Sequence, residues 1–188
     1  MSADQGNQVL RLPRRHSRDT ATLPDPDEGA RLIRQQSLRG AILASLVVVI
    51  AFSAAWALLS VAVGRVFPWM TLVQALLVGF AVRRAGRGID WRFPAVAAMA
   101  AAAGALIGNI VVSAAFTAGE FDTGTLTILR SVTTMTWPVF FDEVMTGADF
   151  IYALFGAGLA AFYSNRRLGR QQYLALRTWQ QQHERRDQ

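Results

Sequence analysis

Apolar residues are gathered into four long blocks along this chain, and short polar stretches separate most of them. The first block, residues 41–63, contains no charged residue. At about 1.5 Å per helical residue it is long enough to cross a hydrocarbon layer of about 30 Å. Apolar residues collected in this way, instead of spread with helical or strand period, are typical of membrane proteins. The pattern therefore predicts transmembrane helices.

The remaining blocks cover residues 67–82, 94–118 and 149–165. The second block is short and has Gln74 near its middle. Trp69 at one end and Arg83 with Arg84 at the other are residue types that anchor a short segment at the two membrane interfaces. Because short links join the first block to the second and the second to the third, we expect two antiparallel hairpins. The predicted fold is all-α, with a four-helix transmembrane domain over residues 41–165.

Polar segments lie on both sides of this domain. Residues 1–24 are polar and are predicted to be disordered. Residues 25–40 begin with a helix-start signature, an N-cap Asp25 followed by Glu28, and are predicted to form an amphipathic helix along the membrane surface. Residues 166–188 are predicted to form a cytoplasmic helix that lies on the inner leaflet or packs on a protein partner.

A longer segment, residues 119–148, separates the third and fourth blocks. Its middle is rich in Thr and β-branched residues and has neither helical nor strand period. We therefore expect a loop that lies on the membrane interface or dips into it. In an alternative interpretation, Pro138 starts the fourth helix early and places Asp142 and Glu143 on its first turns.

Charge is distributed asymmetrically about the four blocks. All 19 basic residues are arginine, and 17 of them precede the first block, join the second to the third, or follow the fourth. The other side has Arg65 and Arg130. The positive-inside rule then places both termini in the cytoplasm of a bacterial inner membrane, where the arginines would contact anionic lipid head groups. Because this rule explains the arginines, we predict no specific nucleic-acid binding.

Three acids precede the fourth block on the predicted outer side, namely Asp142, Glu143 and Asp149. An outer position tolerates acids, and Asp149 is placed to cap the N-terminus of the fourth helix. The alternative for this outer acidic cluster is cation binding or proton relay.

Small residues recur at four-residue spacing in the third and fourth blocks. The predicted helix-packing residues are Ala100, Gly104, Gly108, Ala153, Ala157 and Ala161. In lipid, smooth faces allow helices to approach closely. We expect contacts within the bundle or between copies, with a partner's helix as an alternative occupant.

Gln74 and Asn109 are the candidate buried polar residues. An unpaired amide in hydrocarbon is costly and must find a partner. We expect interhelical hydrogen bonds, with a pore-lining or ligand-binding role as the alternative.

The residue inventory restricts the chemistry. The chain has no cysteine, and its two histidines, His16 and His183, lie in the polar ends. Thiolate catalysis, disulfides and cysteine-ligated metals are excluded, and no histidine is placed to bind a metal inside the membrane. We find no nucleotide-binding or nucleophile motif. The sequence therefore predicts no enzyme, metal or cofactor.

Two stretches of the chain resemble a group of uncharacterised bacterial four-helix integral membrane proteins. They are QALLVGFAVRRAGRGIDWRFPAVAAMAAAAGALIGN and GADFIYALFGAGLAAFYSNRR. The likeness covers residues 60–167 and is carried by Gly79, Gly86, Gly88 and Asp149. Some members carry a metal-binding N-terminal module, which this cysteine-free chain lacks. The resemblance implies a fold and no activity.

Packing faces without catalytic groups predict an accessory or scaffold subunit that works through helix contacts, with a membrane-protein partner or as a homo-oligomer. The alternative is a small homo-oligomeric transporter or channel, in which Gln74, Asn109 and the outer acids line a path.

Overall fold

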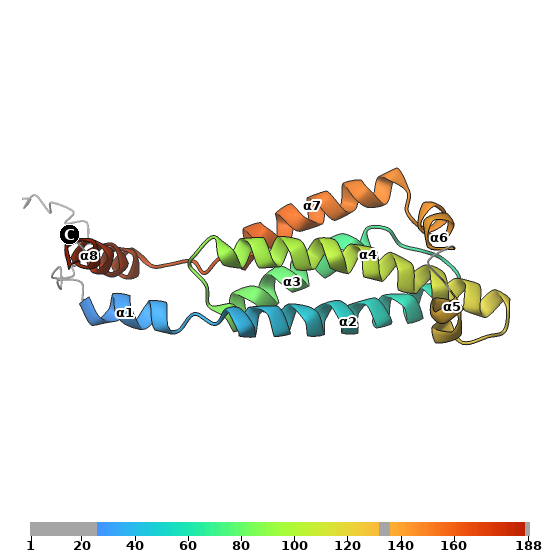
Figure 1. The fold of residues 1–188 in the computed structure, drawn as a ribbon, viewed down its shortest axis with the longest axis horizontal. Helices are drawn as coiled ribbons and strands as arrows, with labels where there is room; N and C mark the ends of the chain where they lie inside the picture. The colour runs from blue at the N-terminus through green and yellow to red at the C-terminus, as the bar shows by residue number, and fades with distance from the viewer. Residues whose placement is uncertain (1–25, 132–135, 187–188) are drawn as a thin grey trace, which may run out of the picture. The chain divides into compact units, whose positions relative to one another are not determined.

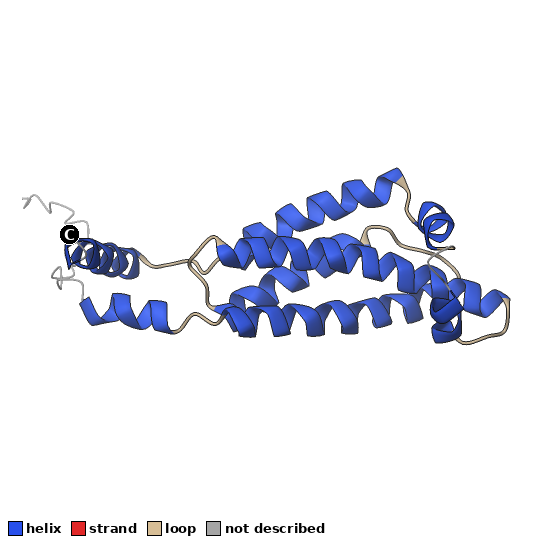
Figure 2. Cartoon of the chain, viewed as in Figure 1, coloured by secondary structure: helices blue, strands red, loops and turns tan. Residues whose placement is uncertain are grey.

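The computed structural model describes residues 26–131 and 136–186, and these residues form helices without any strand (Figures 1 and 2). The helices are α1 Pro26–Arg34, α2 Leu38–Val63, α3 Met70–Gly86, α4 Arg92–Glu120, α5 Thr125–Ser131, α6 Trp137–Val144, α7 Gly147–Ser164 and α8 Arg170–Arg186. The prediction of an all-α fold is confirmed. The predicted disorder of residues 1–24 and the predicted cap at Asp25 lie outside the described residues.

Four helices, α2, α3, α4 and α7, pack together as a bundle (Figure 1). Both α2 and α7 contact α3 and α4, whereas α2 and α7 do not contact each other within the described part of the chain. Each of these helices coincides with one of the four apolar blocks. Main-chain hydrogen bonds join their ends on one side, from Ser37 N–H to the Gly86 carbonyl at 2.9 Å and from Arg166 N–H to the Gly88 carbonyl at 3.2 Å. The helices therefore alternate in direction.

Local signals fix where α2 begins and ends. The side chain of Ser37 accepts a hydrogen bond from Gly40 N–H at 3.0 Å and caps the helix. Gly64 ends it in the left-handed conformation at φ 68°, which glycine adopts without strain. The segment expected to be helical over residues 25–40 is consequently divided, because α1 ends at Arg34 and Ser37 starts a new helix.

Inside the bundle most side chains are small. The largest buried apolar cluster combines Ala41, Val49, Ala75, Val78, Val82, Phe93, Ala97, Ala101 and Ala160. Many large apolar side chains point outward instead, including Leu43, Val47, Leu58, Leu154 and Phe155. A water-soluble bundle has its apolar stripe turned inward, and this bundle differs from that pattern.

Of the described helices, two are long and apolar enough to cross a membrane by themselves, namely α2 with 26 residues and α4 with 29. Helix α3 has 17 residues, and α7 has 18, with Asp149 in its first turn. Of the four predicted spans, two therefore have the length and composition that a span requires.

The segment between α4 and α7 differs from the expected loop. It contains the two short helices α5 and α6, both in contact with α4. Pro138 lies in the first turn of α6, as the alternative interpretation required, but α6 ends at Val144 and α7 begins separately at Gly147. Thr146 separates them because it caps α7.

The chain divides into two compact units, one comprising the bundle, Leu32–Leu168, and the other containing most of α1 together with α8. Within the second unit, a Cβ atom added to Gly29 would lie 2.7 Å from the carbonyl oxygen of Ala175. Helix α1 therefore approaches α8 closely at a residue that has no side chain.

Candidate functional site

Neutral polar side chains of α2, α3 and α4 are buried inside the bundle. Gln74 of α3 is completely buried. Its Nε2 donates a hydrogen bond to Oγ of Ser53 at 3.1 Å and a longer one to the carbonyl oxygen of Val49 at 3.4 Å. Helix α3 thus sends a long polar side chain across to α2.

Glycines of α4 make room for this side chain. A Cβ atom at Gly104 would lie 3.3 Å from Cδ and Nε2 of Gln74, and one at Gly108 would lie 3.6 Å from its Oε1. The Cβ at Gly108 would also lie 2.7 Å from Cζ3 of Trp56, a buried residue of α2. Because glycine has no side chain, α4 can approach both neighbours closely. Two of the small residues predicted to pack on this helix, Gly104 and Gly108, therefore pack inside the chain.

Five buried polar atoms of these helices lack a hydrogen-bond partner within the described residues. They are Nε1 of Trp56, Oγ of Ser60, Oγ1 of Thr71, Oε1 of Gln74 and Nδ2 of Asn109. Each such atom costs about 1–3 kcal/mol when it stays unpaired away from water. We call these five residues together with Ser53 the polar core.

The polar core offers hydroxyl, amide and indole groups. These groups donate and accept hydrogen bonds, and none of them changes its charge near neutral pH. They suit the binding of water or of a neutral polar molecule. Acid-base catalysis needs a group that titrates near the working pH, which the polar core does not supply.

Both polar candidates from the sequence, Gln74 and Asn109, are buried, with exposed fractions of 0% and 5%. Gln74 makes the expected interhelical hydrogen bonds, whereas Nδ2 of Asn109 makes none among the described residues. Sequence reasoning missed the other members, Ser53, Trp56, Ser60 and Thr71. A signal existed for two of them, because Ser45, Ser53 and Ser60 recur at intervals of eight and seven residues and so share one helix face.

The outer acids do not form one site. Asp142 of α6 is exposed, and the side chain of Glu143 lies outside what the structure describes. Asp149 is buried and its Oδ2 accepts from Thr146 N–H at 2.9 Å and from Thr146 Oγ1 at 2.6 Å. The predicted role of Asp149 as N-cap is wrong, because Thr146 holds that position and Asp149 completes a capping box three residues later. Across the described residues, no three His, Cys, Asp or Glu side chains lie together as a metal ion would require.

Small residues also bring α3 and α7 together, although with a shift from the predicted positions. Ala153, Ala157 and Ala161, like Ala100 of α4, are partly exposed. The buried small residues of α7 are Gly156 and Ala160. A Cβ at Gly79 of α3 would lie only 2.9 Å from the carbonyl oxygen of Ala160. The closest approach therefore involves the residues that neighbour the predicted ones.

Comparison with known proteins adds no further assignment to this site. No protein-family model, curated protein or solved structure matches the chain.

Proposed function

We propose that this chain is an integral membrane protein of the bacterial inner membrane, with spans α2, α3, α4 and α7 and both termini in the cytoplasm. It acts as an accessory or scaffold subunit that works through helix contacts. The observation that carries the proposal is the inverted polarity of the bundle. Most of the large apolar side chains lie outside, whereas the interior consists mainly of alanine, valine and neutral polar side chains, with Trp56 and Phe93 as large exceptions.

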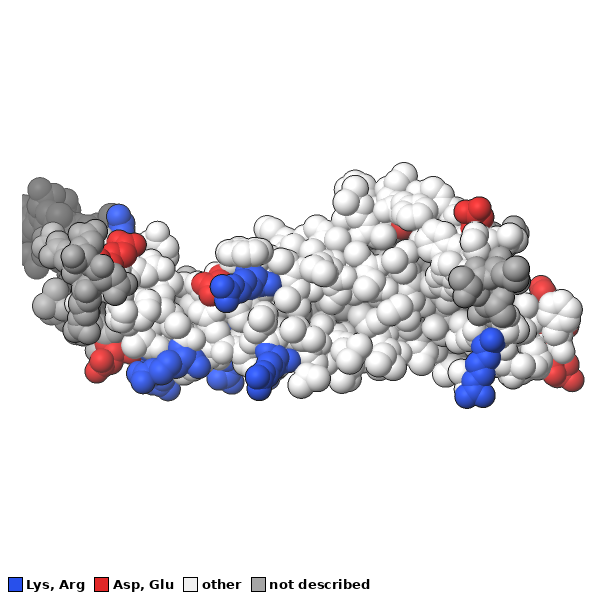
Figure 3. All heavy atoms as spheres, viewed as in Figure 1, with Lys and Arg blue, Asp and Glu red and all other residues white. Residues whose placement is uncertain are grey.

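The outer surface supports a lipid environment. Exposed fractions reach 62% at Leu43, 74% at Leu58 and 75% at Leu154. The middle of the bundle is almost free of charge on the face drawn in Figure 3. A monomeric soluble protein rarely exposes an apolar surface of this extent, whereas lipid tails cover it without cost.

The two shorter helices fit a membrane with help from their ends. Helix α3 covers about 25 Å and α7 about 27 Å at 1.5 Å per residue, slightly less than a hydrocarbon core of about 30 Å. Trp69 is half exposed just before α3, and Arg83 and Arg84 lie in its last turn. Aromatic rings at the interface and long basic side chains that reach water compensate for a short span.

The interior supports an accessory role more than transport. Gly104 and Gly108 pack directly on α2 and α3, so that α4 leaves little room for a path. One observation favours the second candidate, a small homo-oligomeric transporter or channel. The unpaired atoms of the polar core would gain partners from water or a polar solute that passed through.

Cysteine accessibility separates these two functions. Because the chain has no cysteine, single variants Gln74→Cys and Asn109→Cys can be labelled in native membranes with a membrane-impermeant maleimide. Asp122→Cys and Arg87→Cys serve as accessible controls, on the outer and cytoplasmic sides respectively. We expect no label at positions 74 and 109, label at position 122 in intact spheroplasts, and label at position 87 only in inverted vesicles. Rapid labelling at 74 and 109 would contradict the accessory function and favour transport.

Affinity capture then tests the accessory function itself. The tagged chain is purified from native membranes in mild detergent, and the proteins that accompany it are identified by mass spectrometry. We expect a stoichiometric membrane-protein partner. A preparation that contains only copies of this chain would count against an accessory subunit.

A further inference from the structure

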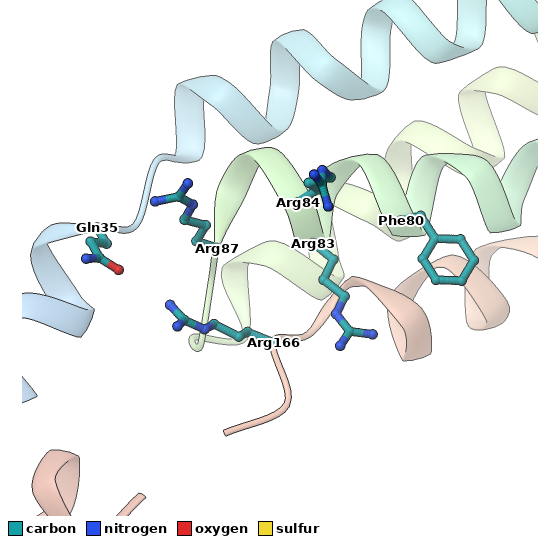
Figure 4. Close-up of a pocket in the computed structure, with 6 residues that line it drawn as sticks. All are labelled: Gln35, Phe80, Arg83, Arg84, Arg87 and Arg166. Atoms are coloured by element: carbon teal, nitrogen blue, oxygen red, sulfur yellow. The ribbon is translucent and has the colours of Figure 1, made fainter. Parts of the chain in front are cut away.

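A basic pocket lies at the end of the bundle where α3 stops. It has a volume of about 440 Å³. The residues that line it are Gln35, Phe80, Arg83, Arg84, Arg87 and Arg166. They come from the connection before α2, from the last turns of α3 and the residue that follows it, and from the segment after α7. In the view of Figure 4, Arg87 and Arg166 extend in the same direction, toward the side on which Gln35 lies, and Phe80 lies on the opposite side.

The pocket concentrates positive charge without an acid to balance it. Four of its six lining residues are arginines, and none is acidic. No ion pair joins these arginines to an acid within residues 26–131 and 136–186. Positive charges gathered around one pocket raise the local electrostatic potential, which favours the binding of an anion there.

Main-chain carbonyl groups do not use up the arginine donors. Helix ends leave carbonyl groups that basic side chains often satisfy. Here main-chain N–H groups occupy three carbonyls at this end, because the Gly86 carbonyl accepts from Ser37 N–H, the Arg83 carbonyl from Arg87 N–H, and the Gly88 carbonyl from Arg166 N–H. The guanidinium groups consequently keep their N–H donors for a ligand.

Arg87 occupies a strained backbone position. It ends α3 in the left-handed conformation, with φ 49° and ψ 29°. Glycine is favoured at such a position, and a side chain there costs free energy. The chain places glycine on both sides, at Gly86 and Gly88, and arginine at the strained residue itself. Topology and the helix dipole account for a basic residue near this end, but neither requires one at this residue.

Phe80 gives the pocket an apolar side. It is half exposed, and its ring lies 5.4 Å from that of Tyr163 on α7. A ligand with an anionic group and adjoining hydrocarbon would match arginines on one side and aromatic rings on the other. Guanidinium groups bind phosphate oxygens in a forked, bidentate geometry, and a phospholipid joins such a phosphate to hydrocarbon.

We propose that this pocket binds a phosphate group, carried either by the head group of an anionic phospholipid or by a free phosphate. The lipid source rests on the membrane placement proposed above. The free-phosphate source does not, because it needs only the pocket.

Native mass spectrometry of the full chain in detergent tests the proposal. Phosphatidylglycerol and phosphatidylcholine with the same acyl chains are added separately, and orthophosphate is then added as a competitor. The variants are Arg87→Gly and the double variant Arg83→Gln with Arg166→Gln. Arg92→Gln, a change near the same end but outside the pocket, is the matched control.

We expect phosphatidylglycerol to bind in preference to phosphatidylcholine, and the double variant to weaken its binding by about tenfold or more, the loss that one charge-assisted hydrogen bond represents. Arg92→Gln should bind within about twofold of the unaltered chain. Arg87→Gly should weaken binding while its thermal midpoint stays the same or rises, because glycine removes the backbone strain. If Arg87 had only a structural role, Arg87→Gly would lower lipid binding and the thermal midpoint together.

Competition by millimolar orthophosphate would identify free phosphate as the ligand, and its failure to compete would identify the lipid head group. Equal binding of the two lipids together with no competition by orthophosphate, or unchanged binding by the double variant, would overturn the proposal. A different result would overturn the accessory function alone. In that case cysteines at positions 74 and 109 are labelled, but the chain still binds phosphatidylglycerol through its arginines, so the proposal for the pocket stands.

Discussion

The contact between α3 and α7 at Gly79 allows a sharp test of the packing. In the variant Gly79→Ala, the added Cβ would lie 2.9 Å from the carbonyl oxygen of Ala160 and 3.2 Å from its Cα. Heavy atoms prefer separations of about 3.5 Å or more, so α7 would have to move outward by roughly half an ångström. The nearest atoms belong to the backbone, and no side-chain rotation relieves the clash.

The magnitude follows from two opposing effects. Overpacking of this kind costs about 1–3 kcal/mol, and we take the upper part of that range because a whole helix must move. Replacing glycine by alanine inside a helix returns up to about 1 kcal/mol. The net result is a destabilisation of about 1–2 kcal/mol. Gly158→Ala in α7 is the matched control, since a Cβ there meets no atom within 4 Å, and it should be stabilised by up to about 1 kcal/mol.

Thermal unfolding in detergent, followed by circular dichroism, measures this difference. The two variants should differ by about 2–3 kcal/mol, which for a chain of this size corresponds to about 4–12 °C in Tm. If Gly79→Ala unfolds at the same temperature as Gly158→Ala, the close approach of α3 and α7 described above is incorrect.

Three further substitutions test the interior and one helix end. Gln74→Leu removes an unpaired oxygen together with two hydrogen bonds and should change the free energy of unfolding by less than about 1.5 kcal/mol in a detergent denaturation series; a larger loss would mean that Oε1 has a partner. Trp56→Ala should lose about 3–5 kcal/mol in the same series, because it empties the space against Gly108, and a loss below that range would contradict the burial of the ring. Asp149→Ala should cost about 0.5–2 kcal/mol and speed hydrogen exchange in the first turn of α7. Unchanged exchange there would refute the capping box with Thr146.

The sequence was a good guide to the helices that carry strong apolar blocks. The blocks at 41–63 and 94–118 lie within α2 and α4, because apolar runs of this length are too long for a strand and favour a helix. It was a poor guide to residues 119–148, where α5 and α6 are too short to show a period. Helix starts depended on single residues. Ser37 and Thr146 are the N-caps, although nearby polar residues could also act as caps. Only the folded backbone shows which residue caps each helix.

The polar core and the basic pocket were visible only in part. Gln74 and Asn109 stood out because amides are rare in apolar blocks, whereas hydroxyls and an indole attract less notice there. The arginines of the pocket were counted as a topological signal, since neither their convergence around one cavity nor the positive φ of Arg87 is encoded in their spacing. Both features depend on helices that are far apart in the sequence.

The two main-chain hydrogen bonds at the basic end have a consequence for the order in which the chain assembles during synthesis. The bond from Ser37 to Gly86 closes as soon as α3 has emerged from the ribosome, whereas the bond from Arg166 to Gly88 must wait for nearly the whole bundle. Helices α2 and α3 can therefore form a closed hairpin early, and the segment after α7 docks last onto the turn that follows α3. A chain that ends before residue 166 would leave the Gly88 carbonyl without the N–H group that it accepts from in the complete bundle.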